Sequence, residues 1–275
     1  MDATIDVSFR FLQDIAKDLA GGDVSFPTFA AATVDIRAAL DNPEVDAERL
    51  ARVISREPLL AAKLVRLANS AALNPSGRPI GDVRTAVIRV GHGTVRAVAV
   101  AVAFDQLRAD RALREYRPRT EAAWRHSVQV ASLAYVLAAK LTRLPPDEAL
   151  FAGLVHDIGY FYLVSRAPRY PELDGHPAEL EAILREWHPS IGQAVLHSFA
   201  LPTAVMDAVG EHETAATRMP PRSIADIVRL ANVVAGESNP ASDPSAAPIA
   251  VDAPLAELLA QSREQLGSLV SSLNN

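Results

Sequence analysis

The 275-residue sequence contains no cysteine. Disulfide bonds and thiolate metal sites are therefore excluded, and any metal must be held by imidazole and oxygen ligands. Aromatic residues make up only 5% of the chain, whereas alanine, leucine, valine and arginine dominate. Because alanine, leucine and arginine are good helix formers, this composition favours a helical protein.

Long apolar runs and excess positive charge are also missing. The most apolar stretch, residues 95–104, is too short to cross a bilayer, and the N-terminus has no signal-peptide pattern. The formal net charge of −6 provides no general attraction for nucleic acid or for an anionic membrane. Gly91-His92-Gly93 is too short for a phosphate-binding loop. We therefore expect a soluble cytoplasmic protein that binds neither a membrane nor nucleic acid.

Helical patterns recur along the whole chain, and strand patterns are almost absent. In residues 5–20, the apolar spacing places Ile5, Phe9, Leu12 and Ile15 on one face of a helix. Further helices are predicted at 28–41, 46–56, 58–72, 82–90, 93–108, 119–142, 177–187, 189–199, 203–213, 221–236 and 255–272. The sequence thus predicts an all-α fold of two packed helical lobes, joined by the charged connection 109–118.

The dipeptide His156-Asp157 lies in an apolar stretch that is predicted to be helical. Asp147 is expected in the first turn of this helix. Burying both groups without partners would cost several kcal/mol, on the order of magnitude expected for polar groups. On one helix their side chains would diverge by about 100°. A divalent metal, a buried hydrogen-bond network or exposure at a groove would satisfy the pair, and the residues alone leave all three open.

Several elements in the first half resemble a known family. They are Phe26-Pro27, residues 47–58, Leu67-Ala68-Asn69-Ser70 and residues 80–91. The second half, from Trp124 to His212-Glu213, resembles an HD-like lobe. Together these stretches are similar to the HDOD family ("HD-related output domain"), which is distantly related to the HD and HD-GYP metal phosphohydrolases.

The resemblance covers residues 20–236, and the helical and linker patterns on either side of it complete a domain organisation. An N-terminal helix (1–20) would precede the HDOD domain (21–236), with lobes at about 21–108 and 119–236. A flexible linker (237–254) and a C-terminal helix (255–275) would follow. That helix is a candidate docking element, or it packs back on the body. The family match also favours a structural role for Leu67-Ala68-Asn69-Ser70, bridging the two lobes.

Relatives of the HD type suggest a ligand set for one or two divalent cations, such as Fe, Mn, Zn or Mg. The matching residues are His126, His156, Asp157, His188 and His212, with Asp157 as the catalytic residue in an active enzyme. Alternatives remain for three of them: His126 as a partner of Asp157, His188 as a surface residue at a helix start before Pro189, and His212 as a helix C-cap.

Three departures from HD-type diesterases argue against hydrolysis. Tyr160 stands where a phosphate-binding lysine is expected, Glu211 replaces the first of two consecutive histidines, and Asn232 replaces a distal aspartate ligand. Asparagine is neutral and binds a hard cation less strongly than a carboxylate. Glu211 or Glu213 could assist a rearranged ligand set.

The resemblance implies a bacterial signal-transduction module, non-catalytic, that acts through contacts with a signalling protein of unknown identity. Self-association into a homo-oligomer is left open. The alternative is a divalent-metal-dependent phosphohydrolase that acts on a cyclic dinucleotide or a nucleotide phosphate. His92, His176 and His197 have no matching context and are expected at the surface, as are Arg84, Arg89 and Arg96.

Overall fold

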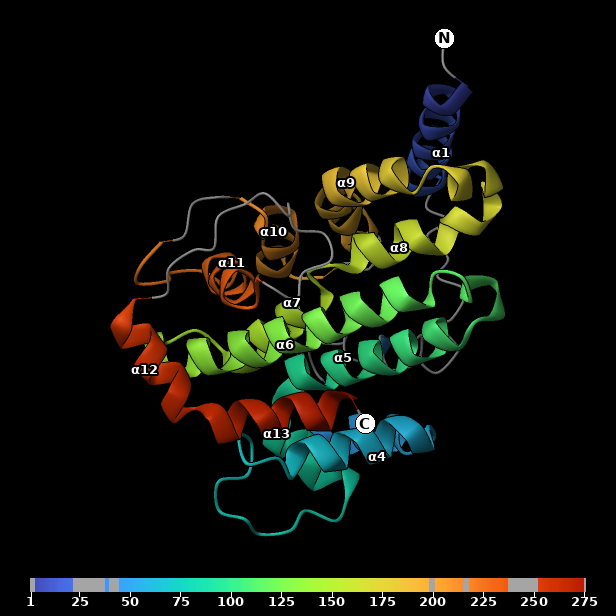
Figure 1. The fold of residues 1–275 in the computed structure, drawn as a ribbon. Coiled ribbons are helices and arrows are strands. Elements are labelled where there is room, and N and C mark those ends of the chain that lie inside the picture. Colours follow the sequence, from blue (N-terminus) through green and yellow to red (C-terminus); the bar gives the residue numbers. More distant parts are fainter. Residues whose placement is uncertain are drawn as a thin grey trace.

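The computed structural model describes residues 3–21, 38–39, 45–197, 201–214, 218–236 and 252–274. These residues form α-helices and short 3-10 helices and contain no strand, so the all-α prediction is confirmed (Figure 1). The α-helices are α1 (Ala3–Ala20), α3 (Ala47–Ile54), α4 (Pro58–Ala68), α5 (Val83–Ala109), α6 (Arg117–Leu141), α7 (Pro146–Val155), α8 (Ile158–Arg166), α9 (Pro177–His197), α10 (Thr203–Glu211), α11 (Ile224–Val234), α12 (Ala253–Gln261) and α13 (Arg263–Asn274). The helix predicted at 28–41 and the linker at 237–254 lie almost entirely outside the described residues.

Helix α5 connects the two halves of the protein, because it packs against α3 and α4 and also against α7. It bends at Gly91, where φ is 78° and ψ is 167°, a backbone conformation that favours glycine. The Gly93 N–H donates to Asp147 Oδ2 at 3.2 Å, and a Cβ on Gly91 would lie 2.9 Å from the same oxygen. The two glycines therefore let the start of α7 approach the bend.

The segment Val83–Ala103 of α5 is the one described helix that has the length and apolar composition of a membrane span. However, 61% of its most apolar window is buried inside the protein. The bend at Gly91 also interrupts the segment. These are features of a core helix that packs against other helices.

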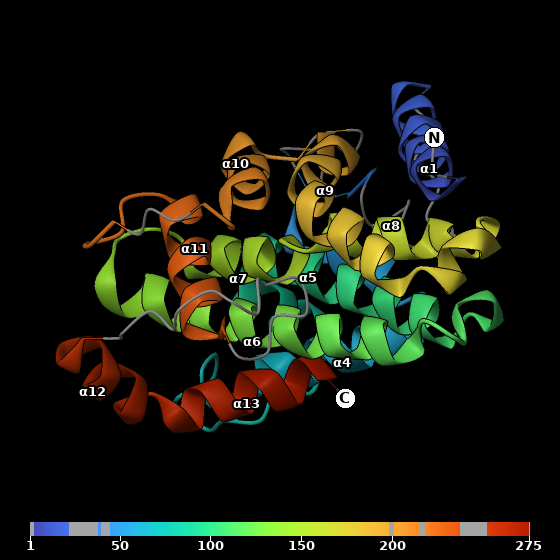
Figure 2. The same ribbon diagram turned by 45° about the horizontal axis from the view of Figure 1, so that its top comes forward.

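Helices α6 and α7 form the centre of the second half (Figure 2). A Cβ on Gly153 would lie only 2.8 Å from the Cα atom of Ala131, so glycine permits a close crossing of the two helices. Trp124 and Leu137 of α6 are fully buried. The crossing lies two residues before the end of α7, and His156 follows that end directly.

The buried face of α1 overlaps the predicted one in part: Ile15 is buried and Leu12 packs against the core as predicted, but Phe9 does not. Val7, Phe11 and Ile15 are buried, whereas Phe9 is 63% exposed. Apolar residues occupy more than one side of this helix. Which side is buried therefore depends on the part of the protein against which α1 packs. That part includes Tyr170, whose ring meets Phe11 edge-on with 5.0 Å between the centroids.

Asn69 has a structural role, but it does not bridge the two lobes as predicted. Its amide Nδ2 donates to the carbonyl oxygens of Val65 and Ile80, and its Oδ1 accepts from the Ile80 N–H at 2.8 Å. All three residues belong to the first half. Asn69 therefore fixes the loop after α4 to the end of that helix.

The C-terminal segment packs back on the body of the protein. The predicted helix 255–272 is divided at Ser262 into α12 and α13, and α13 contacts α4 and α6 (Figures 1 and 2). Leu269 and Leu273 are buried, and Ser268 Oγ accepts from the Ala71 N–H at 2.9 Å. Of the two alternatives for this helix, the structure favours packing on the body.

Candidate metal centre

Five helices bring the predicted ligand residues to one buried point. His126 lies on α6, His156 follows α7, Asp157 precedes α8, His188 lies within α9 and His212 follows α10. The first four side chains have no exposed surface, and His212 is 1% exposed. Residues from distant parts of the sequence thus form a single cluster in the protein interior.

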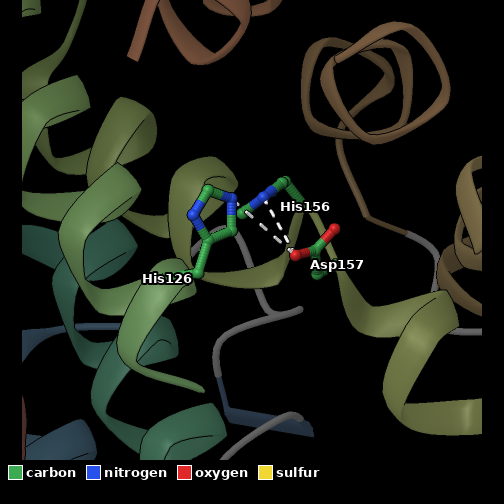
Figure 3. A group of neighbouring side chains, drawn as sticks. All are labelled: His126, His156 and Asp157. Atoms are coloured by element: carbon green, nitrogen blue, oxygen red, sulfur yellow. Dashed lines mark ion pairs between the residues drawn. The ribbon is translucent and has the colours of Figure 1, made fainter. Parts of the chain in front are cut away.

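The sequence predicts that His156 and Asp157 lie within one helix. In the structure they lie between two helices. The chain turns between α7 and α8 at these two residues, with Asp157 at φ −95° and ψ 18°. The Asp157 side chain makes no N-cap hydrogen bond to α8. The turn therefore leaves both side chains available to the cluster, where the His156 Nε2 and Asp157 Oδ2 atoms are 3.3 Å apart (Figure 3).

The close approach of α8 and α9 depends on two glycines. A Cβ on Gly159 would lie 2.5 Å from the backbone nitrogen of Gly192 and would overlap the carbonyl oxygen of His188. A Cβ on Gly192 would meet the Val209 side chain at 2.8 Å. These contacts place His188 beside the turn that carries Asp157.

His188 is a buried residue inside α9 and not a surface residue at a helix start. The predicted helices at 177–187 and 189–199 form one helix, with Pro189 in its interior. Because proline has no N–H, it cannot donate to the Arg185 carbonyl oxygen four residues earlier. The His188 Nδ1 atom takes that place, at 3.0 Å from Arg185 O and 2.9 Å from Leu184 O.

Three of the histidines are oriented in the same way, by backbone carbonyl groups. His156 Nδ1 lies 2.7 Å from Gly153 O, His212 Nδ1 lies 2.7 Å from Val209 O, and His188 follows the same pattern. A carbonyl oxygen accepts hydrogen bonds only, so each Nδ1 carries the proton. In the neutral ring the Nε2 atom then has a free lone pair. Metal-ligating histidines are typically held in this way.

The Nε2 atoms of these three histidines, and that of His126, surround the Asp157 carboxylate. Its Oδ1 lies 3.5 Å from His188 Nε2 and 3.4 Å from His212 Nε2. Its Oδ2 lies 3.3 Å from His156 Nε2 and 4.0 Å from His126 Nε2 (Figure 3). The Nε2 atoms of His188 and His212 are themselves only 3.0 Å apart. The carboxylate thus has two imidazoles on each oxygen.

The arrangement fits a cation. His156 Nε2 and both carboxylate oxygens of Asp157 are buried without a hydrogen-bond partner, which is costly for polar atoms. Two lone pairs 3.0 Å apart, as in His188 and His212, also require a proton or a metal ion between them. Two groups meet the geometric requirement for ligands: His126 with His156 and Asp157, and Asp157 with His188 and His212.

The electrostatics of the cluster favour the ligand forms of His126, His188 and Asp157, but not of His156. Burial, and then the neighbouring His156, lower the pKa of His126 to about 4, and burial also lowers the pKa of His188. Burial opposes ionisation of Asp157, but the imidazoles, His156 foremost, hold its pKa well below the usual value. Burial likewise opposes protonation of His156, but the Asp157 charge outweighs it and raises the pKa. Asp157 is therefore a carboxylate, the form that binds metals.

Asn232, which the sequence comparison placed at a distal ligand position, lies in the cluster and hydrogen-bonds its members. Its Oδ1 lies 2.9 Å from His126 Nε2. Its Nδ2 donates to Glu213 Oε1 at 3.2 Å and to the His212 carbonyl oxygen at 3.4 Å. Glu213 Oε1 in turn lies 3.6 Å from His212 Nε2. Of the two glutamates considered from the sequence, Glu213 therefore belongs to the site.

Glu211 does not replace the missing histidine. Its Oε2 accepts from Arg229 Nη2 at 2.9 Å, and its backbone carbonyl accepts from Arg229 Nε. The pairing joins residues 18 positions apart, so no local sequence pattern indicates it. Tyr160, which stands at the expected lysine position, is 1% exposed; burial raises its pKa to about 12, and the side chain is neutral.

The remaining histidines lie where the sequence predicts them. His92, His176 and His197 are all exposed. Among the arginines expected at the surface, Arg84 forms an exposed ion pair with Glu48, with 2.9 Å between Nε and Oε2. These residues contribute nothing to the buried cluster.

The fold and the site define an all-α domain with a buried imidazole–carboxylate cluster. Residues 26–215 match the HDOD domain family. The chain belongs to this family.

The chain is also similar to a curated protein of unassigned function. A protein of Treponema pallidum (strain Nichols), described as an "Uncharacterized protein", is 25% identical over 212 residues, which are 72% of this chain and 39% of that protein. The chain thus spans about two fifths of that relative's length.

Two solved structures share the fold. A "Putative metal-dependent phosphohydrolase" from Shewanella amazonensis SB2B has a TM-score of 0.73 and 22% identity, over 98% of this chain and 99% of that one. A "Putative signal transduction protein" from Marinobacter aquaeolei VT8 has a TM-score of 0.60 and 18% identity, over 98% and 66%. At such identities the likeness concerns the fold.

Proposed function

We propose that this chain is a regulatory HDOD module that holds a divalent ion in the His/Asp cluster and acts through contact with a signalling protein. In this proposal the ion is a structural or sensed ligand and hydrolyses no phosphate ester. A cytoplasmic location is part of the same proposal. The HDOD family assignment and the fold shared with a protein described as a signal-transduction protein support it.

The observation that carries the proposal is the burial of the four histidines and of Asp157. A catalytic metal keeps one coordination position that water and substrate can reach. Here His126, His156, Asp157 and His188 have no exposed surface, and Glu213 is the member of the cluster that reaches solvent, with its side chain 34% exposed. The burial therefore favours an ion enclosed by protein.

Among the described residues near the cluster, the basic side chains are already paired: Arg119, which interacts with Tyr160, pairs with Glu181. Neutral, buried Tyr160 stands at the expected lysine position, and the Arg229 guanidinium is paired with Glu211 and Asp226. A phosphodiester anion needs positive charge or donor groups near the ion. We infer that binding of a phosphate ester is disfavoured at this centre.

One observation favours the alternative function, a metal-dependent phosphohydrolase. Five side chains of the ligand type converge on one point, as a hydrolase would require. A bound divalent ion in such a centre acidifies water and orients a phosphoester. The Shewanella amazonensis protein of similar fold carries a name of this kind.

A hydrolysis assay separates the two functions. Purified protein loaded with Mn²⁺, Fe²⁺ or Zn²⁺ would be incubated with bis(p-nitrophenyl) phosphate and with a cyclic dinucleotide, and Asp157→Asn would serve as control. We expect the wild-type protein to bind the ion and to show no turnover above that of the variant. Turnover that is lost in Asp157→Asn would establish the hydrolase and overturn the regulatory proposal.

A further inference from the structure

The cluster has two halves, one on each oxygen of the Asp157 carboxylate, and Asn232 contacts both. One half comprises His188 and His212 on the Oδ1 side of Asp157, and the other comprises His126 and His156 on the Oδ2 side. The amide of Asn232 contacts both, through Nδ2 to Glu213 and through Oδ1 to His126.

The orientation of this amide follows from its partners. Glu213 Oε1 and the His212 carbonyl oxygen are both acceptors, so the atom that faces them is the Nδ2 donor. The Oδ1 atom then faces His126 Nε2 at 2.9 Å. Because Oδ1 can only accept, the hydrogen bond requires a proton on His126 Nε2. A protonated ring nitrogen is not a metal ligand.

The half with His188 and His212 is arranged differently. Both Nδ1 atoms donate to backbone carbonyls, so both Nε2 lone pairs point at Asp157 Oδ1. Glu213 Oε1 lies 3.6 Å from His212 Nε2 and 4.0 Å from His188 Nε2, and the Asn232 amide holds it there. This half offers two imidazoles and two carboxylates.

We infer that the centre takes a single divalent cation, bound by Asp157, His188, His212 and Glu213. Asn232 excludes a second ion because its Oδ1 accepts a hydrogen bond from His126 Nε2, so that this nitrogen keeps its proton and cannot bind a metal. The inference depends on one part of the proposed function, namely that the cluster binds a metal ion. It assigns Asn232 as the residue that sets the number of ions, and Glu213 as the ligand nearest to solvent. Two carboxylates and two imidazoles suit Mn²⁺, Fe²⁺ or Zn²⁺.

The test counts Mn²⁺ ions bound at equilibrium, from the electron paramagnetic resonance signal of free Mn²⁺ during titration of metal-stripped protein. His188→Gln and His126→Gln are matched variants, one in each half. Asn232→Asp keeps the shape of the side chain and supplies a carboxylate beside His126. Circular dichroism confirms that each variant is folded.

We expect one ion in the wild-type protein, one in His126→Gln, none in His188→Gln and two in Asn232→Asp, with an exchange-coupled spectrum for the pair. Two ions in the wild-type protein, loss of the ion in His126→Gln, or one ion in Asn232→Asp would overturn the inference. No ion in any variant would overturn metal binding as well. Phosphodiester hydrolysis by wild-type protein with one ion would overturn the regulatory proposal alone.

Discussion

Gly159 and Gly192 face each other where α8 crosses α9, so closely that a Cβ on Gly159 would lie 2.5 Å from the Gly192 backbone nitrogen. The neighbouring atoms belong to the backbone and cannot rotate away. This contact holds His188 against the turn that carries Asp157, which makes glycine at position 159 a requirement of the site.

Gly159→Ala is therefore expected to destabilise the protein by about 1–3 kcal/mol, as overpacking of a tight core does, and to weaken metal binding. Chemical denaturation and metal titration would measure the two effects. Gly267→Ala is the control, because no atom lies within 4 Å of a Cβ at that position, and it should be neutral or slightly stabilising. Equal stability of the two variants would contradict the packing argument.

Pro189→Ala is expected to weaken metal binding without lowering the stability of the metal-free protein. The substitution restores an N–H that can donate to Arg185 O, which removes one of the two carbonyls that hold His188 Nδ1. Loss of such an orienting contact typically weakens metal affinity about 10–100-fold. Isothermal titration with Zn²⁺ would measure the affinity, and thermal unfolding in EDTA should show no loss of stability. Unchanged affinity would remove Pro189 from the description of the site.

Metal binding should stabilise the fold, because the ligands come from several helices. At a free ion concentration 100 times the dissociation constant, the free energy of unfolding rises by about 2.7 kcal/mol. Thermal unfolding of metal-stripped protein with and without Mn²⁺ measures this effect. The increase should vanish in His188→Gln and persist in a surface control, His176→Gln, whose parent residue is exposed.

Asn69→Ala tests the structural role of Asn69. The sequence predicted such a role but did not identify the hydrogen-bond partners. The substitution removes the acceptor of the Ile80 N–H and the donor to the Val65 and Ile80 carbonyls. We expect a loss of about 1–3 kcal/mol in unfolding free energy, with metal binding unchanged. Weaker metal binding in this variant would instead favour the predicted bridge between the lobes.

Leu269→Ala tests whether α13 is part of the folded body. Leu269 is fully buried, and truncation of such a leucine costs about 2–5 kcal/mol. Glu264→Ala, at an exposed position of the same helix, is the control. If Leu269→Ala were as stable as its control, the helix would be a loosely attached arm and a docking role would be favoured.

Much of the fold and the ligand set could be predicted from the sequence, because apolar periodicity and turn residues are local signals. His126, His156, Asp157, His188 and His212 were recognised through motif resemblance, and the structure brings all five together. Their geometry was not predictable in the same way. A helix through Pro189 is an exception to proline's usual behaviour and depends on tertiary packing.

Contacts between residues distant in the sequence account for the other differences. Asn232 lies 106 positions from His126, and Arg229 lies 18 positions from Glu211, so no periodic pattern connects them. The buried face of α1 depends on Tyr170, far along the chain. In each case the partner, and not the local sequence, determines the outcome.

The most direct test of the central claim, that the buried cluster is a cation site, is anomalous diffraction from crystals of the protein soaked in Mn²⁺ or Zn²⁺. The account predicts one strong anomalous peak among Asp157, His188 and His212, at the distances of direct ligands (about 2.0–2.2 Å). An empty cluster, with any bound ions confined to the protein surface, would contradict it.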